Sequence, residues 1–346
     1  MVFLHEPKYR AEQIFVSVHG KNAKRIEDIK GIPFALIKML EASYCINSVR
    51  NLKVTDSLNF NTKKYLFETE DKQRIESVLI SEKGRNTVCI STQAGCNVGC
   101  EFCATGKMGF NKNLEAGEIV SQVYEVKRLS GEEPTNIVYM GMGEPFLNYD
   151  NMLKSLKILT NEKGIAIPSR RITVSTVGFK DKIKRFADDI LNPENKSVKN
   201  VKLALSLHTT DNGLREKLIP SSVKNRLPDI YSELAYFYKT TGNKVTYEYI
   251  YFEGLNDTDS DIKRLTRLSK MIPSNINIIP FHPIGFELNE PLNVFKNKKD
   301  IDKLHSDKNL SGFIKKLKAE KVVVNLRNSS GVDIDAACGQ LAVLNK

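Results

Sequence analysis

Three cysteines lie within eight residues of one another, in the segment CNVGCEFC. Cys96, Cys100 and Cys103 have the spacing C-x-x-x-C-x-x-C, and Gly95 and Gly99 free the loop to wrap. Thiolates are the usual ligands of iron–sulfur clusters, and three of them bind three irons of a four-iron cluster. The fourth iron stays open for S-adenosylmethionine, which an electron from the cluster can cleave to an adenosyl radical. The spacing therefore predicts one 4Fe-4S cluster with S-adenosylmethionine as cofactor.

A structural zinc site is the alternative interpretation of these cysteines. Such a site would need a fourth Cys or His ligand in suitable partnership. The sequence has no CxxC or HxxxH pair elsewhere to complete it. Six cysteines in 346 residues, three of them clustered, also do not form the pattern of a secreted disulfide framework. The cysteine pattern therefore favours the cluster.

The elements that must position this loop alternate between strands and helices. Helical periodicity is clear in residues 114–130, where Ile119, Val123 and Val126 share one face. Such alternation predicts an α/β fold with a parallel sheet and right-handed crossovers, closed or partly closed into a barrel. The predicted strands are 87–91, 136–140, 171–176, 201–207, 244–252, 275–281 and 321–326, and further helices are expected near 148–161, 228–242, 258–271 and 309–320.

Residues 1–80 depart from this alternation. Helical segments near 8–17 and 34–44 precede residues 63–81, which read as a hairpin around Glu70 to Lys72. We therefore expect a small N-terminal accessory domain over residues 1–80 and a core domain over residues 81–346.

Polar and glycine-rich segments follow several predicted strands, at the edge where parallel barrels carry their chemistry. In GMGEP, the absent side chain of Gly143 lets a ligand approach, and Glu144 can accept a hydrogen bond from an amino group. A glycine turn is also common punctuation after a strand, and His208 could be a satisfied structural histidine. The residues expected to bind S-adenosylmethionine here are Gly143, Glu144, Ser175, Ser206, Leu207 and His208.

The charge balance and the amino terminus are less specific indications of function than the motifs. Lys and Arg number 52 against 41 Asp and Glu, an excess of 11. That sign suits a protein that binds phosphates, although a solvated surface accounts for it equally well. No apolar leader and no run of about 18 apolar residues is present, so we expect a cytoplasmic protein without a membrane segment.

Motifs along the whole chain resemble those of the RlmN/Cfr family of radical S-adenosylmethionine RNA methyltransferases. The resemblance implies a partial (β/α)6 radical SAM barrel preceded by an accessory domain, which would then bind RNA. The motifs are EPKYRAEQIF, RIESVLI, CISTQAGCNVGCEFCATGKMGF, GMGEPFLN, RRITVSTVG, LALSLH, EGLNDT and VDIDAACGQL.

The resemblance also implies a mechanism. One S-adenosylmethionine methylates Cys338, and the radical from a second takes a hydrogen from that methyl group, which then adds to an adenine. Cys89 matches the resolving cysteine that forms a transient disulfide with Cys338, and Glu76 matches the proposed proton acceptor. Without this chemistry, the two cysteines would be inert core thiols and Glu76 an exposed hairpin carboxylate with an ordinary pKa.

The expected substrate is adenosine 2503 of 23S rRNA, with adenosine 37 of tRNA as a second target. Pro145 favours methylation at adenine C2, because Cfr-like sequences, which methylate C8, typically have Ala there. A non-catalytic, metal-stabilised RNA-binding protein and a radical enzyme with a non-RNA substrate are also compatible with the residues. We expect a monomer that receives electrons from an external donor such as flavodoxin or ferredoxin.

One position departs from the family. His282 occupies a position that is commonly Asn and contacts the cofactor, and His is bulkier and titrates near neutrality. A basic surface for RNA is expected at residues 170–171 and 180–185, although these lysines and arginines also fit a solvated helix face.

Overall fold

The computed structural model describes residues 6–282, 284–295, 308–327 and 330–343. Within these ranges one large sheet has ten strands in the order β1-β2-β3-β4-β7-β8-β9-β10-β11-β12, and β5 pairs with β6 separately. The strands are β1 Val49–Asp56, β2 Thr62–Thr69, β3 Arg74–Glu82, β4 Arg85–Cys89, β5 Gln93–Gly95, β6 Phe110–Asn113, β7 Asn136–Tyr139, β8 Ile172–Thr176, β9 Lys202–Ser206, β10 Val245–Tyr251, β11 Ser274–Pro280 and β12 Val324–Leu326.

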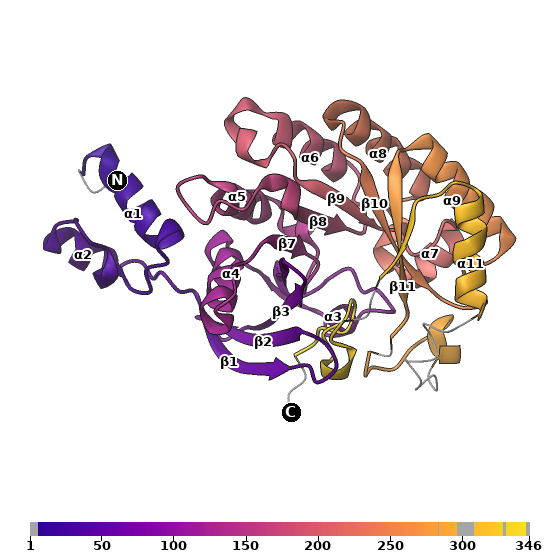
Figure 1. The fold of residues 1–346 in the computed structure, drawn as a ribbon, viewed down its shortest axis with the longest axis horizontal. Coiled ribbons are helices and arrows are strands. Elements are labelled where there is room, and N and C mark those ends of the chain that lie inside the picture. The colour runs from indigo at the N-terminus through magenta and orange to yellow at the C-terminus, as the bar shows by residue number, and fades with distance from the viewer. Residues whose placement is uncertain (1–5, 283, 296–307, 328–329, 344–346) are drawn as a thin grey trace.

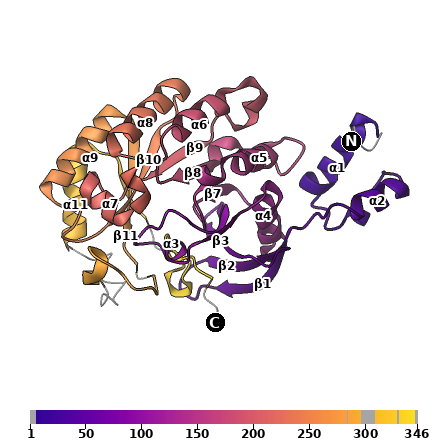
Figure 2. The same ribbon diagram turned by 180° about the vertical axis from the view of Figure 1, so that it is seen from behind.

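The strands from β4 to β12 in this order are mutually parallel, and helices connect them across the outside of the curved sheet (Figures 1 and 2). This arrangement confirms the predicted α/β fold of the radical SAM type. Every strand predicted for the core forms, although α6 and α7 were not predicted. The helices are α3 Ala104–Lys107, α4 Ala116–Ser130, α5 Tyr149–Thr160, α6 Lys182–Leu191, α7 Asn212–Leu218, α8 Leu227–Thr241, α9 Asp259–Met271 and α11 Lys308–Ala319.

Local sequence explains where the longer helices begin and end. The Glu115 side chain accepts from the first turn of α4 while Glu118 accepts from the Glu115 N–H, and Gly131 ends the helix in the left-handed region at φ 74°. Thr258 and Asp261 cap α9 in the same reciprocal way. These caps satisfy backbone groups that a helix end leaves free, so the crossovers start and stop at defined residues.

The main hydrophobic core lies between the sheet and its helices. Val88, Ile137, Val174, Leu203 and Tyr247 are fully buried on successive parallel strands. Parallel strands are covered on both faces, which is why these segments read as short apolar runs. The core holds the strand ends, and the loops that follow them, in fixed positions.

The N-terminal region divides between its own small core and the large sheet. Helices α1 (Lys8–Phe15) and α2 (Phe34–Glu41) lie to one side of the barrel in Figure 1, and a separate apolar cluster of Ile26, Ile29, Leu36 and Leu40 holds the residues around them. The predicted hairpin forms between β2 and β3, but β1 to β3 continue the barrel sheet and share its core. The domain boundary at residue 80 stays a prediction.

The C-terminal segment after β12 runs back beside β2 and α3 (Figure 1). Asp333 accepts hydrogen bonds from the Ser57 hydroxyl at 2.8 Å and the Leu58 N–H at 2.9 Å. Further along, the Ala104 N–H donates to the Gly339 carbonyl at 2.7 Å. The segment that contains Cys338 is therefore tied to both the hairpin region and the cysteine loop.

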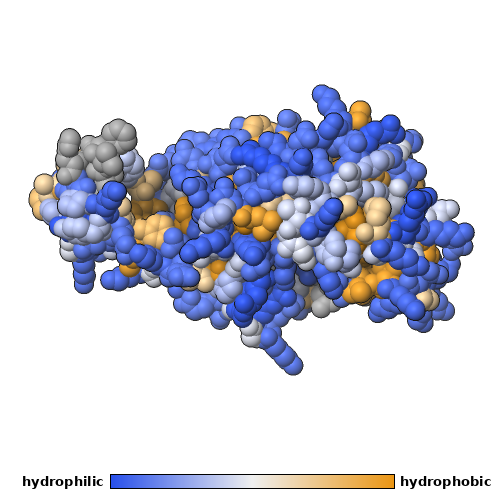
Figure 3. Space-filling view, turned by 90° about the horizontal axis from the view of Figure 1, so that it is seen from above, coloured by the Kyte–Doolittle hydropathy of each residue, from blue (hydrophilic) through white to orange (hydrophobic). Residues whose placement is uncertain are grey.

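On the face shown in Figure 3, the surface of the molecule is largely polar and hydrophobic side chains are confined to small patches. Among the described residues, no helix has both the length and the apolar character needed to span a bilayer.

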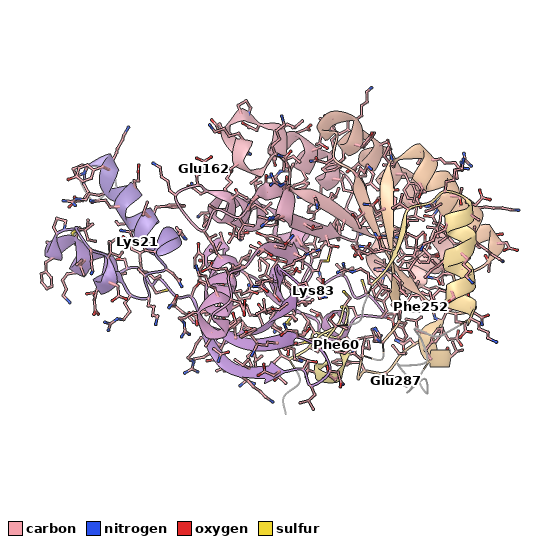
Figure 4. The ribbon with its side chains drawn as sticks, viewed as in Figure 1. Lys21, Phe60, Lys83, Glu162, Phe252 and Glu287 are labelled. Atoms are coloured by element: carbon pink, nitrogen blue, oxygen red, sulfur yellow. The ribbon has the colours of Figure 1, made fainter. Side chains whose placement is uncertain are left out.

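The junction between the N-terminal helices and the barrel contains a half-buried histidine. His19 follows α1 in a short turn (Val16–Gly20), and its Nδ1 lies 2.9 Å from the Tyr124 hydroxyl on α4. Close by, Glu12 forms an ion pair with Lys163 at 2.7 Å. Lys21 and Glu162, labelled in Figure 4, mark the two sides of this junction. Burial lowers the pKa of His19 to about 4.

This lowered pKa predicts acid sensitivity at the junction. Because the folded pKa of about 4 lies below the ordinary 6.5, the unfolded chain binds more protons between these values. His19 therefore stabilises the fold above pH 6.5 and loses that contribution as the pH falls toward 4. We expect the unfolding midpoint of wild type to fall, relative to that of His19→Gln, between pH 7.5 and 5. Tyr124→Phe keeps the histidine and should follow wild type; parallel curves for wild type and His19→Gln would contradict this role of His19.

Candidate active site

A cavity of about 140 Å³ opens at the carboxyl ends of the parallel strands. Strand ends and the cysteine loop supply its polar lining. The lining residues predicted from the sequence are Cys96, Cys100, Cys103, Gly143, Glu144, Ser175, Ser206, His208 and Cys338. The structure therefore brings most of the predicted site residues into one cavity.

The cysteine loop owes its shape to two glycines. Gly95 has φ +75°, and a Cβ there would lie 2.0 Å from the Gly109 carbonyl oxygen. That carbonyl accepts the N–H of Cys96 at 2.8 Å. A Cβ on Gly106 would lie 2.9 Å from the backbone nitrogen of Cys100. Larger residues at either position would displace the turns that aim the cysteines into the cavity.

The three thiols lie in apolar surroundings. Cys96 and Cys100 belong to a buried cluster with Phe102, Phe252 and Phe281, and Phe252, labelled in Figure 4, follows the carboxyl end of β10. Burial raises the pKa of Cys96 to about 12, raises that of Cys100 well above its ordinary value, and raises that of Cys103 as well. As neutral thiols they are poor nucleophiles, whereas a bound metal displaces the proton and binds the thiolate.

The arrangement fits a cluster better than a single ion. In the described part of the chain, no three His, Cys, Asp or Glu side chains are placed to hold one metal ion. Zinc requires its ligands to converge on one point, whereas each thiolate of a cluster binds a different iron. All three thiols line one cavity together with Glu144, Ser175 and Ser206. The residues present therefore fit the predicted cofactors.

Glu144 is buried with both carboxylate oxygens in use. Oε1 accepts the Phe146 N–H and Oε2 accepts the Val177 N–H, each at 2.9 Å. Burial raises its pKa to about 7, although these two hydrogen bonds oppose the rise. A carboxylate has capacity for further bonds, so Glu144 can still accept from an amino group in the cavity.

The glycines of GMGEP line the cavity and also allow a close approach within the chain. A Cβ on Gly143, at φ +96°, would lie 2.5 Å from the Gln93 Cβ, and a Cβ on Gly141 would lie 2.7 Å from the Ile90 carbonyl. The close approach is therefore to the chain itself. It packs GMGEP against the segment that leads into the cysteine loop.

The hydroxyls and the imidazole meet at the neighbouring strand ends. The Ser175 and Ser206 hydroxyls lie 3.3 Å apart across β8 and β9. His208 Nδ1 accepts the Ile250 N–H at 3.1 Å, and burial lowers the pKa of the ring to about 3. The ring is therefore neutral with its proton on Nε2, as a donor. Leu207 is fully buried and is not part of the cavity lining.

A second cavity, of about 70 Å³, adjoins the first through Cys338. Cys338 lines both cavities, and Cys89 and His282 line the second. Cys338 is solvent-accessible, yet its surroundings remove hydration and raise the pKa of the thiol. Burial, with Cys338 nearby, raises the pKa of Cys89 to about 12. The structure thus places Cys338 between the cysteine loop and Cys89, and His282 apart from Ser175 and Ser206.

Glu76 lies in neither of these cavities. It lines a third, with Lys64, Asp335 and Ala342. Its Oε1 pairs with the Lys64 Nζ at 3.2 Å, and its Oε2 accepts the Ala342 N–H at 3.0 Å. Burial raises the pKa of Glu76, and the Lys64 charge opposes that rise. The predicted proton acceptor is therefore bonded to the C-terminal segment rather than grouped with Cys89 and Cys338.

Two residues of the site were missed from the sequence. Lys64 could have been found from the hairpin register, because Leu66 pairs with Glu76 and Lys64 lies two residues away on the same face. Arg215, on the short helix α7, is completely buried behind the cavity wall. Nothing in its sequence neighbourhood distinguishes it from a solvated helical arginine.

The sequence pattern of the radical SAM superfamily matches residues 90–268, which include the cysteine loop and the strands from β5 to β10. With the parallel sheet and the three-cysteine cavity at its strand ends, this match defines the protein as a radical SAM enzyme. Members of that class use S-adenosylmethionine and an iron–sulfur cluster.

Similar proteins show which family of radical SAM enzymes the chain belongs to. A probable dual-specificity RNA methyltransferase RlmN from Salinibacter ruber is 38% identical over 97% of this chain and 88% of its own length. Ribosomal RNA large subunit methyltransferase N from Nitrosopumilus maritimus is 39% identical over 96% and 92%, respectively. A crystal structure of a radical SAM methyltransferase from Sphaerobacter thermophilus matches with a TM-score of 0.83 at 36% identity, covering 96% of this chain and 93% of that one. The chain therefore belongs to the RlmN family of radical SAM RNA methyltransferases, as its motifs predicted.

The cavity predicts which cysteines bind iron. After anaerobic reconstitution with iron and sulfide, Cys96→Ala, Cys100→Ala and Cys103→Ala should each lose most of the bound iron and the visible absorbance, because each removes one of three ligands. Cys45 is exposed and far from the loop in sequence, so Cys45→Ala is the matched control and should retain both. Undiminished iron in all three loop variants would exclude this loop as the cluster site.

Proposed function

We propose that this enzyme methylates C2 of an adenine in RNA, with adenosine 2503 of 23S rRNA as substrate and adenosine 37 of tRNA as a second substrate. The observation that carries the proposal is the place of Cys338, which lines both the cavity of the three loop cysteines and the cavity of Cys89. The names of the relatives from Salinibacter ruber and Nitrosopumilus maritimus, a dual-specificity RNA methyltransferase and a ribosomal RNA methyltransferase, support the substrates.

The chain's own residues hold the cofactors. Cys96, Cys100 and Cys103 bind one 4Fe-4S cluster, and an external donor such as flavodoxin or ferredoxin reduces it. When bound together, the cluster and S-adenosylmethionine supply a methyl group and a radical that abstracts hydrogen. Glu144 accepts from the amino group of S-adenosylmethionine, and the Ser175 and Ser206 hydroxyls bind its polar groups.

The other residues predicted to contact S-adenosylmethionine have less direct support from their positions. Gly143 and His208 line the same cavity, Leu207 supports its wall from behind, and His282 reaches the neighbouring cavity. A donor at His208 Nε2 suits an acceptor atom of the cofactor.

Cys338 carries the methyl carbon, and Cys89 releases it. Methylation needs the Cys338 thiolate, which partial desolvation by the surrounding protein disfavours and the positive charge of Arg327 favours. Cys338 is close enough to Cys89 to contribute to the raised pKa of that thiol. Cys89 forms a transient disulfide with Cys338 as the methylated base departs.

Loss of the resolving thiol should trap the enzyme on its substrate. With Cys89→Ser we expect an RNA–protein adduct that survives denaturing electrophoresis, because the base stays bonded through carbon to Cys338. Cys45→Ser should turn over normally, and Cys338→Ser should form neither product nor adduct. A Cys89→Ser variant that releases methylated RNA at the wild-type rate would contradict the assigned role.

Glu76 remains the proposed proton acceptor, with a pKa that burial raises toward the range a base needs. Its bond to the Ala342 N–H offers a second role, which is to hold the segment that contains Cys338. Glu76→Gln separates the two. If Glu76 is the base, the variant should still acquire methyl on Cys338 but should form little product. Loss of Cys338 methylation as well would show instead that Glu76 positions the segment.

The position of the methyl group tests the proposal as a whole. Pro145 begins a 3₁₀ turn (Pro145–Asn148) and lines the cavity. The resemblance to RlmN-like sequences, which have Pro here where Cfr-like ones have Ala, supports C2 over C8. Nucleoside mass spectrometry and position mapping of rRNA and tRNA after reaction should find 2-methyladenosine. Methyl at C8 would establish the Cfr-like activity instead, and absence of any methylated nucleoside with an intact cluster would exclude RNA as the substrate.

The proposed RNA-binding surface includes the basic residues predicted at 170–171 and 180–185. Of the predicted basic residues, Arg185 pairs with Asp150 at 2.6 Å and stacks on Tyr149, and Lys184 lies over Tyr236. Arg185 is therefore neutralised locally, and Arg170, Arg171, Lys180 and Lys182 remain the proposed phosphate contacts of this surface.

A further inference from the structure

Arg215 is a buried cation without a carboxylate partner. Its side chain is 1% exposed, and its guanidinium donates from Nη2 to the Val177 carbonyl and, at 3.2 Å, to the Ser206 carbonyl. Nε donates to the Leu207 carbonyl at 3.4 Å, and Nη1 has no hydrogen-bond partner among the residues that the structure describes. No described acidic side chain lies within ion-pair distance of it. Burying a charge in this way is costly unless another charge compensates it.

The position of the guanidinium points to what that charge is. The carbonyls it binds follow β8 and end β9, at the mouth where Ser175 and Ser206 line the cavity. Val177 and Ser206, whose carbonyls Arg215 binds, line the same cavity as the three loop cysteines. The helix that carries Arg215 also packs on the cysteine loop, because the Glu101 N–H donates to the Leu218 carbonyl at 3.0 Å. Arg215 itself is not part of the cavity lining, so it acts through the wall rather than on a ligand within.

We propose that Arg215 is the counter-charge of the iron–sulfur cluster and sets its reduction potential. This inference rests on the cluster assigned above to Cys96, Cys100 and Cys103. Three thiolates make that site electronegative, and each reduction adds one electron to it. A fixed positive charge in a medium of low dielectric constant stabilises the reduced form more than the oxidised form. Arg215 thereby eases the electron transfer without contacting S-adenosylmethionine or RNA.

A purely structural role explains less of the geometry. Binding the three carbonyls accounts for Nε and Nη2, and a neutral donor could do the same. A structural role does not explain why the buried donor carries a full positive charge, or why its Nη1 lacks a hydrogen-bond partner among the described residues. The experiment must therefore separate the charge from the hydrogen bonds.

The test is a redox titration of the reconstituted full-length enzyme in the absence of S-adenosylmethionine. Electron paramagnetic resonance measures the fraction of reduced cluster at each potential. Arg215→Gln and Arg215→Met remove the charge and should lower the midpoint potential by at least about 59 mV, tenfold in a one-electron equilibrium. Arg215→Lys keeps the charge and should stay close to wild type. Arg264 lies on the outer helix α9 and pairs with Asp261, so Arg264→Gln is the matched control and should not shift.

Each outcome decides the inference. Unshifted potentials in the neutral variants, or equal shifts in the lysine variant, would overturn it. If the neutral variants fail to take up iron while the lysine variant succeeds, the cluster itself requires the positive charge. That result would support Arg215 as the counter-charge of the cluster. Failure of all three variants would indicate a structural role and overturn it. Failure of wild type to form a cluster would instead contradict the proposed function.

Discussion

The hydrogen bond from the Ala104 N–H to the Gly339 carbonyl, at 2.7 Å, joins the two halves of the site. Ala104 directly follows the last loop cysteine, and Gly339 directly follows Cys338. Gly339 adopts φ +83°, and a Cβ there would lie 3.1 Å from the Phe102 carbonyl oxygen, so the close approach depends on glycine. Two segments that are more than two hundred residues apart in sequence are thus held in register. The position of Cys338 between two cavities depends on this contact.

Burial gives the cavity its second constraint, which is electrostatic. The loop thiols, Glu76, Glu144 and Glu248 all have pKa values raised by desolvation, and His208 has a lowered one. Each of these shifts disfavours the charged form. The exception is Arg215, whose ordinary pKa is high enough for the side chain to stay charged when buried. Arg215 is thus a buried positive charge beside groups whose charged forms burial disfavours, and a bound cluster changes that balance.

Much of this arrangement could be predicted from residue spacing, because local rules fix it. The apolar runs gave the parallel strands, and CNVGCEFC gave the loop. Longer-range relations could not be predicted. Glu76 was expected to accept a proton, and its bond to the Ala342 N–H depends on how the C-terminal segment packs. Gly143 was assigned to ligand approach, and its close approach to Gln93 could not be predicted either. The burial of Arg215 depends on contacts between elements that no single window of sequence contains.

The central claim is that the carbon transferred to RNA first resides on Cys338, and an isotope chase tests it most directly. The enzyme is first exposed to S-adenosylmethionine with a deuterated methyl group and then freed of it. RNA, reductant and unlabelled S-adenosylmethionine are added for a single turnover. If Cys338 is the carrier, the methyl group found in the RNA carries deuterium from that cysteine. An unlabelled methyl group in the first-turnover product would contradict the claim.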